Sequence, residues 1–202
     1  MKMSFKTEQA RKLMKLKLVT QPQVISHVEK VTKKAIEIGR ILREKGVDVD
    51  LELLEMGGYL HDIGRSVTHG VRHGIESGKI LRKLGFSEPL IKLVERHVGA
   101  GITKEEATKL GLPSQNYIPE TLEEKILAYA DKFLESELVF RTVNGEQIAE
   151  REDIEYESIE PTLIRFRKIF GKNSPVVLRL ENLRDEIEKL IKYKKECKCL
   201  NF

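Results

Sequence analysis

The stretch Gly57-Gly58-Tyr59-Leu60-His61-Asp62-Ile63-Gly64-Arg65 decides how the chain is interpreted. It places an imidazole beside a carboxylate, between glycines, at the end of an apolar helix predicted from Leu51 to about His61. Neighbouring residues on a regular helix point about 100° apart, so His61 and Asp62 can turn toward one point only where the helix ends. Neutral imidazole and carboxylate are both good ligands for borderline divalent metals. A His-Asp pair alone is weak evidence, and the other polar residues of the inner faces decide its meaning.

Four further ionisable residues lie at positions where helical spacing predicts an apolar face: His27, His73, His97 and Asp131. The predicted helices run from Pro22 to Gly46, His73 to Leu84, Ser87 to Val98 and Leu122 to Val139. Taken singly, such a histidine is more often hydrogen-bonded in the core, and such an aspartate is more often an internal ion-pair partner. Burying several of them without partners would cost several kcal/mol each. One shared cation cluster satisfies all of them together.

The remaining pattern predicts an all-α fold. Asp50 is a candidate N-cap, and two capping boxes open further helices at Thr103 and Thr121. The polar segment from Arg141 to Tyr156 is interpreted as a loop or short hairpin. Two final helices are predicted from Ser158 to Phe170 and from Ser174 to about Tyr193. We expect three parts: an N-terminal helix (1–21), a helical bundle domain (22–140) and a C-terminal helical extension (156–202).

Composition narrows the class of protein. The 202 residues are 40% hydrophobic, which allows one sizeable core. The net charge of +4 is small and spread along the chain, so nucleic acid is not the expected partner. The N-terminus has no secretory pattern, and no apolar run approaches the ~20 residues that span a bilayer. Cys197 and Cys199 are expected to be reduced residues of a lysine-rich tail. We therefore expect a cytoplasmic protein that does not enter a membrane.

The order of these residues resembles the HD superfamily of metal-dependent phosphohydrolases. The strings Leu60–Arg65, His73–Gly78 and Ile126–Lys132 look like successive elements of that family, and the resemblance covers about residues 22 to 140. The two additional histidines resemble the dinuclear branches, which include diadenosine-tetraphosphate hydrolases and cyclic-dinucleotide phosphodiesterases. The string Gly-Tyr-Pro that marks the latter is absent after the His-Asp element, which favours the former.

The resemblance implies a site for two divalent metal ions. His27, His61, Asp62 and Asp131 would hold one metal, His73 and His97 would hold the second, and Asp62 would bridge them. His69 also precedes a glycine, but we prefer His73 because the helical pattern continues after it. The ligand types fit Fe, Mn, Zn, Ni or Co and do not choose among them.

The expected chemistry is hydrolysis of a nucleotide or dinucleotide phosphoester or phosphoanhydride by a metal-activated hydroxide. Asp62 is the candidate proton acceptor. Arg65 is the candidate phosphate ligand because its guanidinium offers a forked pair of donors, although a solvated loop arginine is the ordinary alternative. Thr68, Arg72 and Lys132 are weaker candidates for substrate contact.

Two rival interpretations stay open. The first is a non-catalytic, metal-stabilised helical module that binds a nucleotide or a protein partner. The second is a plain helical interaction domain that binds no metal. The complete ligand set favours the enzyme, because a purely structural metal needs no open coordination position. The long final helix is a candidate surface for a homodimer, and the sequence leaves the substrate open.

Overall fold

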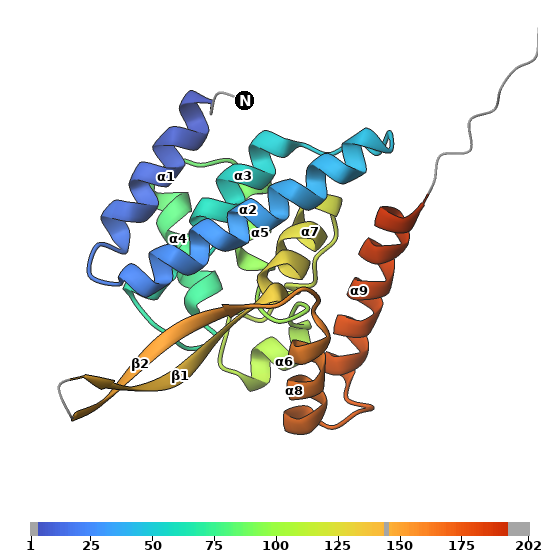
Figure 1. The fold of residues 1–202 in the computed structure, drawn as a ribbon. Coiled ribbons are helices and arrows are strands. Elements are labelled where there is room, and N and C mark those ends of the chain that lie inside the picture. Colours follow the sequence, from blue (N-terminus) through green and yellow to red (C-terminus); the bar gives the residue numbers. More distant parts are fainter. Residues whose placement is uncertain (1–3, 144–145, 194–202) are drawn as a thin grey trace, which may run out of the picture.

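The apolar stripes of the sequence become the buried faces of a helical bundle. The computed structural model describes residues 4–143 and 146–193, and Figure 1 shows the arrangement of their elements. The elements are α1 (Phe5–Lys17), α2 (Pro22–Glu44), α3 (Leu51–Leu60), η1 (Ile63–Ser66), α4 (His73–Lys83), α5 (Glu88–Glu95), α6 (Lys104–Lys109), α7 (Leu122–Ala130), η2 (Asp131–Phe133), β1 (Leu134–Val143), β2 (Glu146–Glu155), α8 (Glu160–Phe170) and α9 (Pro175–Lys192). The all-α prediction is confirmed, since the sheet found in the described residues is a single two-stranded hairpin.

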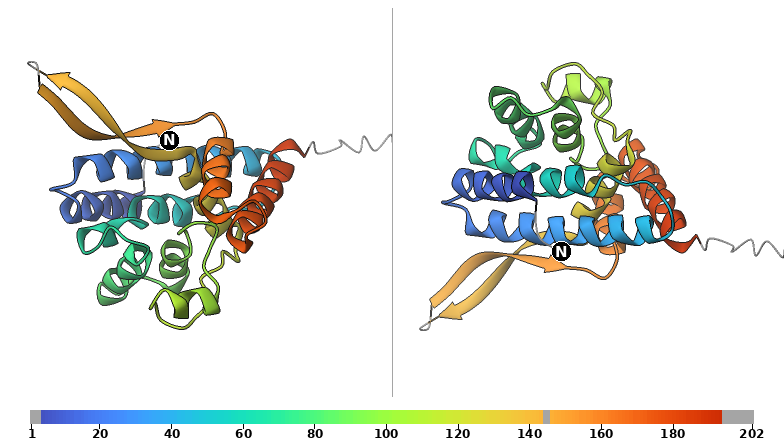
Figure 2. Two further views of the ribbon diagram at one scale, coloured as in Figure 1. Left: turned by 90° about the horizontal axis from the view of Figure 1, so that it is seen from below. Right: turned by 90° about the horizontal axis from the view of Figure 1, so that it is seen from above.

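The long helix α2 lies along one side of the helical bundle, and the views in Figure 2 show α1 and α3 running alongside it. α2 packs against α3 and α7, while α1 packs on α3. Its inner stripe includes Val28, Val31, Ala35 and Leu42, all with no exposed surface. Burying a side chain such as Val or Leu stabilises the fold by about 1.5–3 kcal/mol relative to leaving it in water.

Two glycines of α3 allow its close packing between α2 and α5. A Cβ atom at Gly58 would lie 2.8 Å from Thr32 Oγ1, and one at Gly57 would lie 2.0 Å from Leu93 Cδ2. Both distances are too short for real contacts, so a larger residue would push the helices apart. The two glycines thus bring the end of α3 against both neighbours.

Helix caps follow the sequence signals. The Asp50 side chain accepts a hydrogen bond from the Leu53 N–H, and both capping boxes, Thr103 with Glu106 and Thr121 with Glu124, are formed. These caps satisfy backbone N–H groups that the first turn of a helix leaves without partners.

Two predicted helix ends are wrong. α5 ends at Glu95 instead of continuing through Val98, and α7 ends at Ala130 instead of near Val139. From Leu134 onward the chain pairs with a later segment, and Leu134 lies opposite Glu155. The segment predicted to be a loop or short hairpin is therefore a hairpin with ten-residue strands. It begins at Leu134, seven residues before the predicted start at Arg141. Strand pairing between distant segments overrides local helical spacing.

The final helix packs on its own bundle. Val177, Leu180, Leu183 and Ile187 are its buried residues, and it contacts α7, α8 and α2. Cys197 and Cys199 lie outside the described residues. Within the described part of the chain, no helix has the length and apolar content needed to cross a membrane. The division into 1–21, 22–140 and 156–202 stays a prediction.

Candidate metal centre

All six residues named as metal ligands from the sequence meet where several helix ends converge. His61 and Asp62 follow α3, His97 follows α5, Asp131 follows α7, His73 opens α4, and His27 comes from the first half of α2. The side chains of His61, Asp62, His73 and His97 are buried. His27 and Asp131 keep 16% and 14% of their side chains exposed and form the outer edge of the cluster.

Asp62 lies at the middle of the cluster, and its two oxygens face different imidazoles. Oδ1 lies 3.1 Å from His73 Nε2 and 3.5 Å from His97 Nε2. Oδ2 lies 3.8 Å from His27 Nε2 and 3.7 Å from His61 Nε2. The carboxylate therefore separates the cluster into two halves.

Within each half of the cluster, two candidate ligands also contact each other. On one side His27 Nε2 lies 3.0 Å from Asp131 Oδ1, and on the other His73 Nε2 lies 3.0 Å from His97 Nε2. The potential ligand atoms of His27, His61 and Asp131 all lie within 4.8 Å of one another, as do those of His61, Asp62 and His97. Either set is compact enough to surround one cation.

Backbone carbonyl groups orient three of the imidazoles. Nδ1 of His61, His73 and His97 lies 2.7, 2.8 and 2.6 Å from the carbonyl oxygen of the residue three positions earlier: Gly58, Gly70 and Val94. A carbonyl oxygen only accepts, so Nδ1 carries the hydrogen in each neutral ring and donates it. The lone pair is left on Nε2, which faces the cluster, and this tautomer is the one that binds metals.

Two atoms of the cluster are buried without hydrogen bonds: His61 Nε2 and Asp62 Oδ1. The contacts of Asp62 Oδ1 with two imidazoles are short, but they do not have hydrogen-bond geometry. A buried polar atom without a partner destabilises a fold by about 1–3 kcal/mol. Imidazole nitrogens and carboxylate oxygens directed at one point would each gain a partner by binding a shared divalent cation. The residues present therefore fit a metal.

The charge states also favour a metal. Burial lowers the pKa of His61 to about 3 and lowers the pKa of His97, so both rings are neutral near pH 7. Burial alone would raise the pKa of Asp62, but the neighbouring His61 and His73 outweigh it and hold that pKa well below its ordinary value. Burial would likewise raise the pKa of Asp131, but Lys132 and His27 hold it well below the ordinary value. The cluster therefore presents the neutral imidazoles of His61 and His97 and two ionised carboxylates.

Two cationic side chains contact these carboxylates. Arg65 Nε donates to Asp62 Oδ2, and Lys132 Nζ donates to Asp131 Oδ2. Arg65, expected to face a phosphate, is thus paired with a candidate ligand and keeps 27% of its side chain exposed. The sequence ranked Lys132 only as a weak substrate contact. The sequence analysis missed that Lys132 pairs directly with Asp131. The signal for this pairing was that the two residues are neighbours in the sequence.

Ser77 fixes the His-Asp turn, and sequence reasoning assigned it no such role. Its hydroxyl donates to the His61 carbonyl at 2.7 Å and accepts from the Gly64 N–H at 2.8 Å. A Cβ atom at Gly64 would lie 2.0 Å from the His73 carbonyl oxygen. The turn thus lies directly against the start of α4, and this contact brings His73 to Asp62.

Comparison with known proteins shows the family of the chain. The family model described as "HD domain" matches residues 24–135, which is more than half of the chain and includes all six residues of the cluster. The chain belongs to the HD domain family.

Relatives of this HD protein carry different names. The uncharacterized protein MJ0778 of Methanocaldococcus jannaschii is 45% identical over 177 residues, which are 88% of this chain and 95% of that protein. A tRNA (cytidine(56)-2'-O)-methyltransferase of Picrophilus torridus is 37% identical over 153 residues, which are 76% of this chain and 42% of the methyltransferase. The chain therefore spans less than half of that relative. The solved HD domain of the L. monocytogenes phosphodiesterase PgpH, in complex with cyclic-di-AMP, is similar in fold with a TM-score of 0.49 and 17% identity, covering 91% of this chain and 98% of that one.

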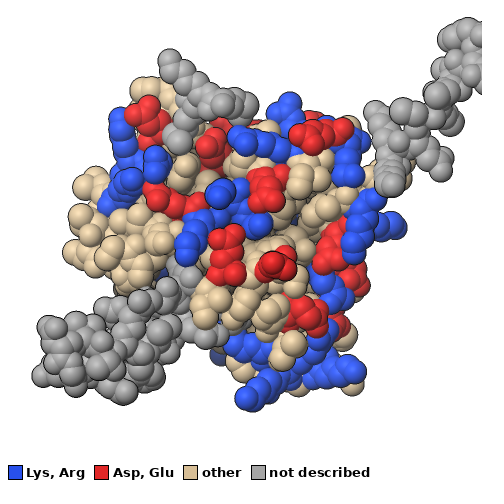
Figure 3. Space-filling model, viewed as in Figure 1, with Lys and Arg blue, Asp and Glu red and all other residues tan. Residues whose placement is uncertain are grey.

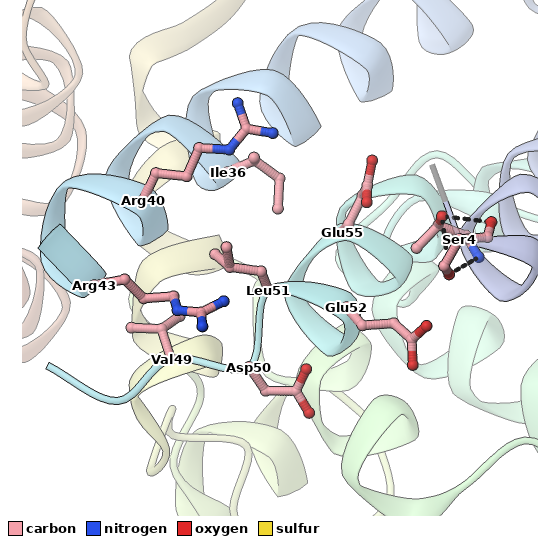
Figure 4. A pocket seen from close by; sticks show the side chains of 10 residues that line it. Ser4, Ile36, Arg40, Arg43, Val49, Asp50, Leu51, Glu52 and Glu55 are labelled. Carbon is pink, nitrogen blue, oxygen red and sulfur yellow. Dashed lines mark hydrogen bonds between the residues drawn. The ribbon is translucent and has the colours of Figure 1, made fainter. Parts of the chain in front are cut away.

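The fifth histidine of this HD protein lies outside the cluster. His69 is exposed in the loop before α4, whereas His73 is buried against Asp62. A cavity of 420 Å³ also lies elsewhere, between α2, α3 and the start of α1, as Figure 4 shows. Arg40, Arg43 and Glu55 are among its lining residues, and none of the six cluster residues is. The metal centre and this cavity are separate features.

Proposed function

We propose that this HD protein is a phosphohydrolase that requires two divalent metal ions and cleaves a phosphoester or phosphoanhydride bond of a nucleotide or dinucleotide. The observation that carries the proposal is the position of Asp62, whose two oxygens face different imidazoles. A carboxylate in this position can bridge two cations. The dinuclear branch that resembles diadenosine-tetraphosphate hydrolases is our preferred assignment.

His27, His61, Asp62 and Asp131 would hold one cation, and His73 and His97 would hold the other with Asp62 shared. Cations held here would supply the Lewis acidity and the positive charge that hydrolysis of a phosphate bond requires. Fe, Mn, Zn, Ni and Co all accept this donor set.

The chain's own residues divide the remaining tasks. The pKa of Asp62 lies well below its ordinary value, which makes its carboxylate a better cation ligand than proton acceptor. We therefore assign Asp62 chiefly to holding the cations, and proton uptake second. Arg65 and Lys132 stand beside the two carboxylates and supply donors for phosphoryl oxygens. The substrate we propose is a small-molecule phosphate in the cytoplasm.

The rival functions make different use of the same cluster. A non-catalytic module would bind metal for stability alone, and a plain helical domain would bind none. Methyl transfer, named for one relative, is not proposed, because the chain spans less than half of that protein and its own cluster has the donors of a metal site.

The test uses the full chain, stripped of metal with a chelator and reloaded with each of the five metals. We expect turnover on a panel of nucleotide phosphoesters and anhydrides, lost in folded His61→Ala and Asp62→Ala variants. His69→Ala is the matched control, because it removes a histidine outside the cluster and should retain turnover. Metal binding without turnover on any compound would establish the non-catalytic module, and absence of metal binding would establish the plain helical domain.

A further inference from the structure

The hairpin β1–β2 projects from the bundle. Its strands pair from Leu134 opposite Glu155 to Val143 opposite Glu146. At about 3.4 Å per residue, ten residues extend roughly 34 Å. Figures 1 and 2 show the hairpin leaving the bundle beside α2 and ending far from α8 of the same copy, and α2 is the helix it mainly contacts. A two-stranded hairpin standing alone is marginally stable in water, so the part of this one that projects beyond α2 would be stabilised by a further surface to pack on.

The sequence of the hairpin indicates which charge a complementary surface would carry. Its two strands contain seven acidic residues and two arginines. The register also places Glu137 opposite Glu152. Like charges at opposite positions destabilise a strand pair unless a cation neutralises them. A basic surface would therefore complement the hairpin, and its acidic charge opposes nucleic acid.

A surface with these properties lies on α8. Ile164, Arg165, Lys168 and Ile169 lie at helical spacing on α8, and Lys172 follows just after its end. We call these exposed residues together the α8 strip. Ile164 and Ile169 are 59% and 63% exposed. Lys168 and Lys172 form no ion pair with any residue that the structure describes. Figure 3 shows basic side chains gathered at this end of the molecule, over α8.

We propose that the hairpin of one copy of the chain lies along the α8 strip of a second copy, and the second copy's hairpin lies along the strip of the first. The acidic ribbon and the basic, partly apolar strip are complementary in charge, and both belong to this chain. A two-fold axis uses each contact twice and closes the assembly as a dimer. This interface lies outside the metal centre and does not depend on the proposed function.

Charge-reversal variants test the interface by sedimentation equilibrium of the full chain. We expect the wild-type protein to be a dimer, and we expect Lys168→Glu/Lys172→Glu and Glu150→Lys/Glu152→Lys each to raise the dimer dissociation constant about ten-fold or more, because like charges then meet. Lys83→Glu/Lys92→Glu, which reverses the same number of charges at exposed positions of α4 and α5, is the matched control and should leave the dissociation constant unchanged.

Mixing the two charge-reversed proteins gives the sharpest result. In a mixed dimer each reversed hairpin meets a reversed strip, and each native hairpin meets a native strip, so we expect heterodimers with near wild-type affinity. A wild-type monomer at micromolar concentration would overturn the proposal. A dimer that both reversals leave intact, or reversed proteins that fail to combine, would overturn it as well.

Discussion

Replacing Ser77 by alanine should loosen the metal centre without touching any candidate ligand. The Ser77 hydroxyl joins the His61 carbonyl to the Gly64 N–H, and all three residues are buried. The Ser77→Ala variant loses two hydrogen bonds and leaves a buried N–H and a buried carbonyl without that partner. Taking about 1–2 kcal/mol for each of the two buried groups left unsatisfied, we expect the free energy of unfolding to fall by about 2–4 kcal/mol. For a protein of this size that is a fall in Tm of roughly 4–16 °C.

The assay is urea unfolding of the metal-free protein, followed by titration of the folded variant with metal. Groups that orient ligands contribute about 10–100-fold to metal affinity, so we expect a loss of that order. Ser66→Ala is the matched control, because its hydroxyl donates to the Ile63 carbonyl from an exposed position and should contribute less than about 0.5 kcal/mol. Wild-type stability and metal affinity in Ser77→Ala would refute the role of this turn.

Three further changes test the fold and the charges around it. Gly58→Ala should destabilise the protein by about 1–3 kcal/mol in urea unfolding, because its Cβ would lie 3.0 Å from the Thr32 Cα; a neutral result would contradict the tight α2–α3 contact. Glu124→Ala should lower stability by about 3 kcal/mol, because the buried Arg96 loses its buried carboxylate partner and keeps the exposed Glu120, and a change below 1 kcal/mol would show that the buried pair is dispensable. Because burial lowers the pKa of His61 from 6.5 to about 3, the unfolded chain takes up this proton first as pH falls. The metal-free protein should therefore lose up to about 1.4 kcal/mol per pH unit below pH 6.5, and a urea midpoint at pH 5.5 equal to that at pH 7.5 would refute this.

The sequence predicted the gathering of the cluster because helical spacing is a local property. His27 falls on the stripe that includes Val24, Val28 and Val31, so its direction toward the core follows from the period of the helix alone. The same reasoning located Asp131, because an aspartate on an inner face must be paired or bound to a metal.

The features that were missed depend on contacts between distant segments. β1 forms because residues 146–155 lie beside it, and no local pattern in 134–139 contains that information. Asn144-Gly145 is a known hairpin-turn signal, and it was the available clue to the longer strands. The role of Ser77 depends on the turn at Gly64, thirteen residues away, which the helical pattern of α4 does not report.

Anomalous diffraction from crystals of the metal-loaded protein tests the central claim most directly. We expect two metal peaks, one beside His27, His61 and Asp131 and the other beside His73 and His97, with Asp62 between them. A single peak would contradict the bridging role of Asp62, and a fully loaded crystal with no peak among these six residues would contradict the metal centre itself.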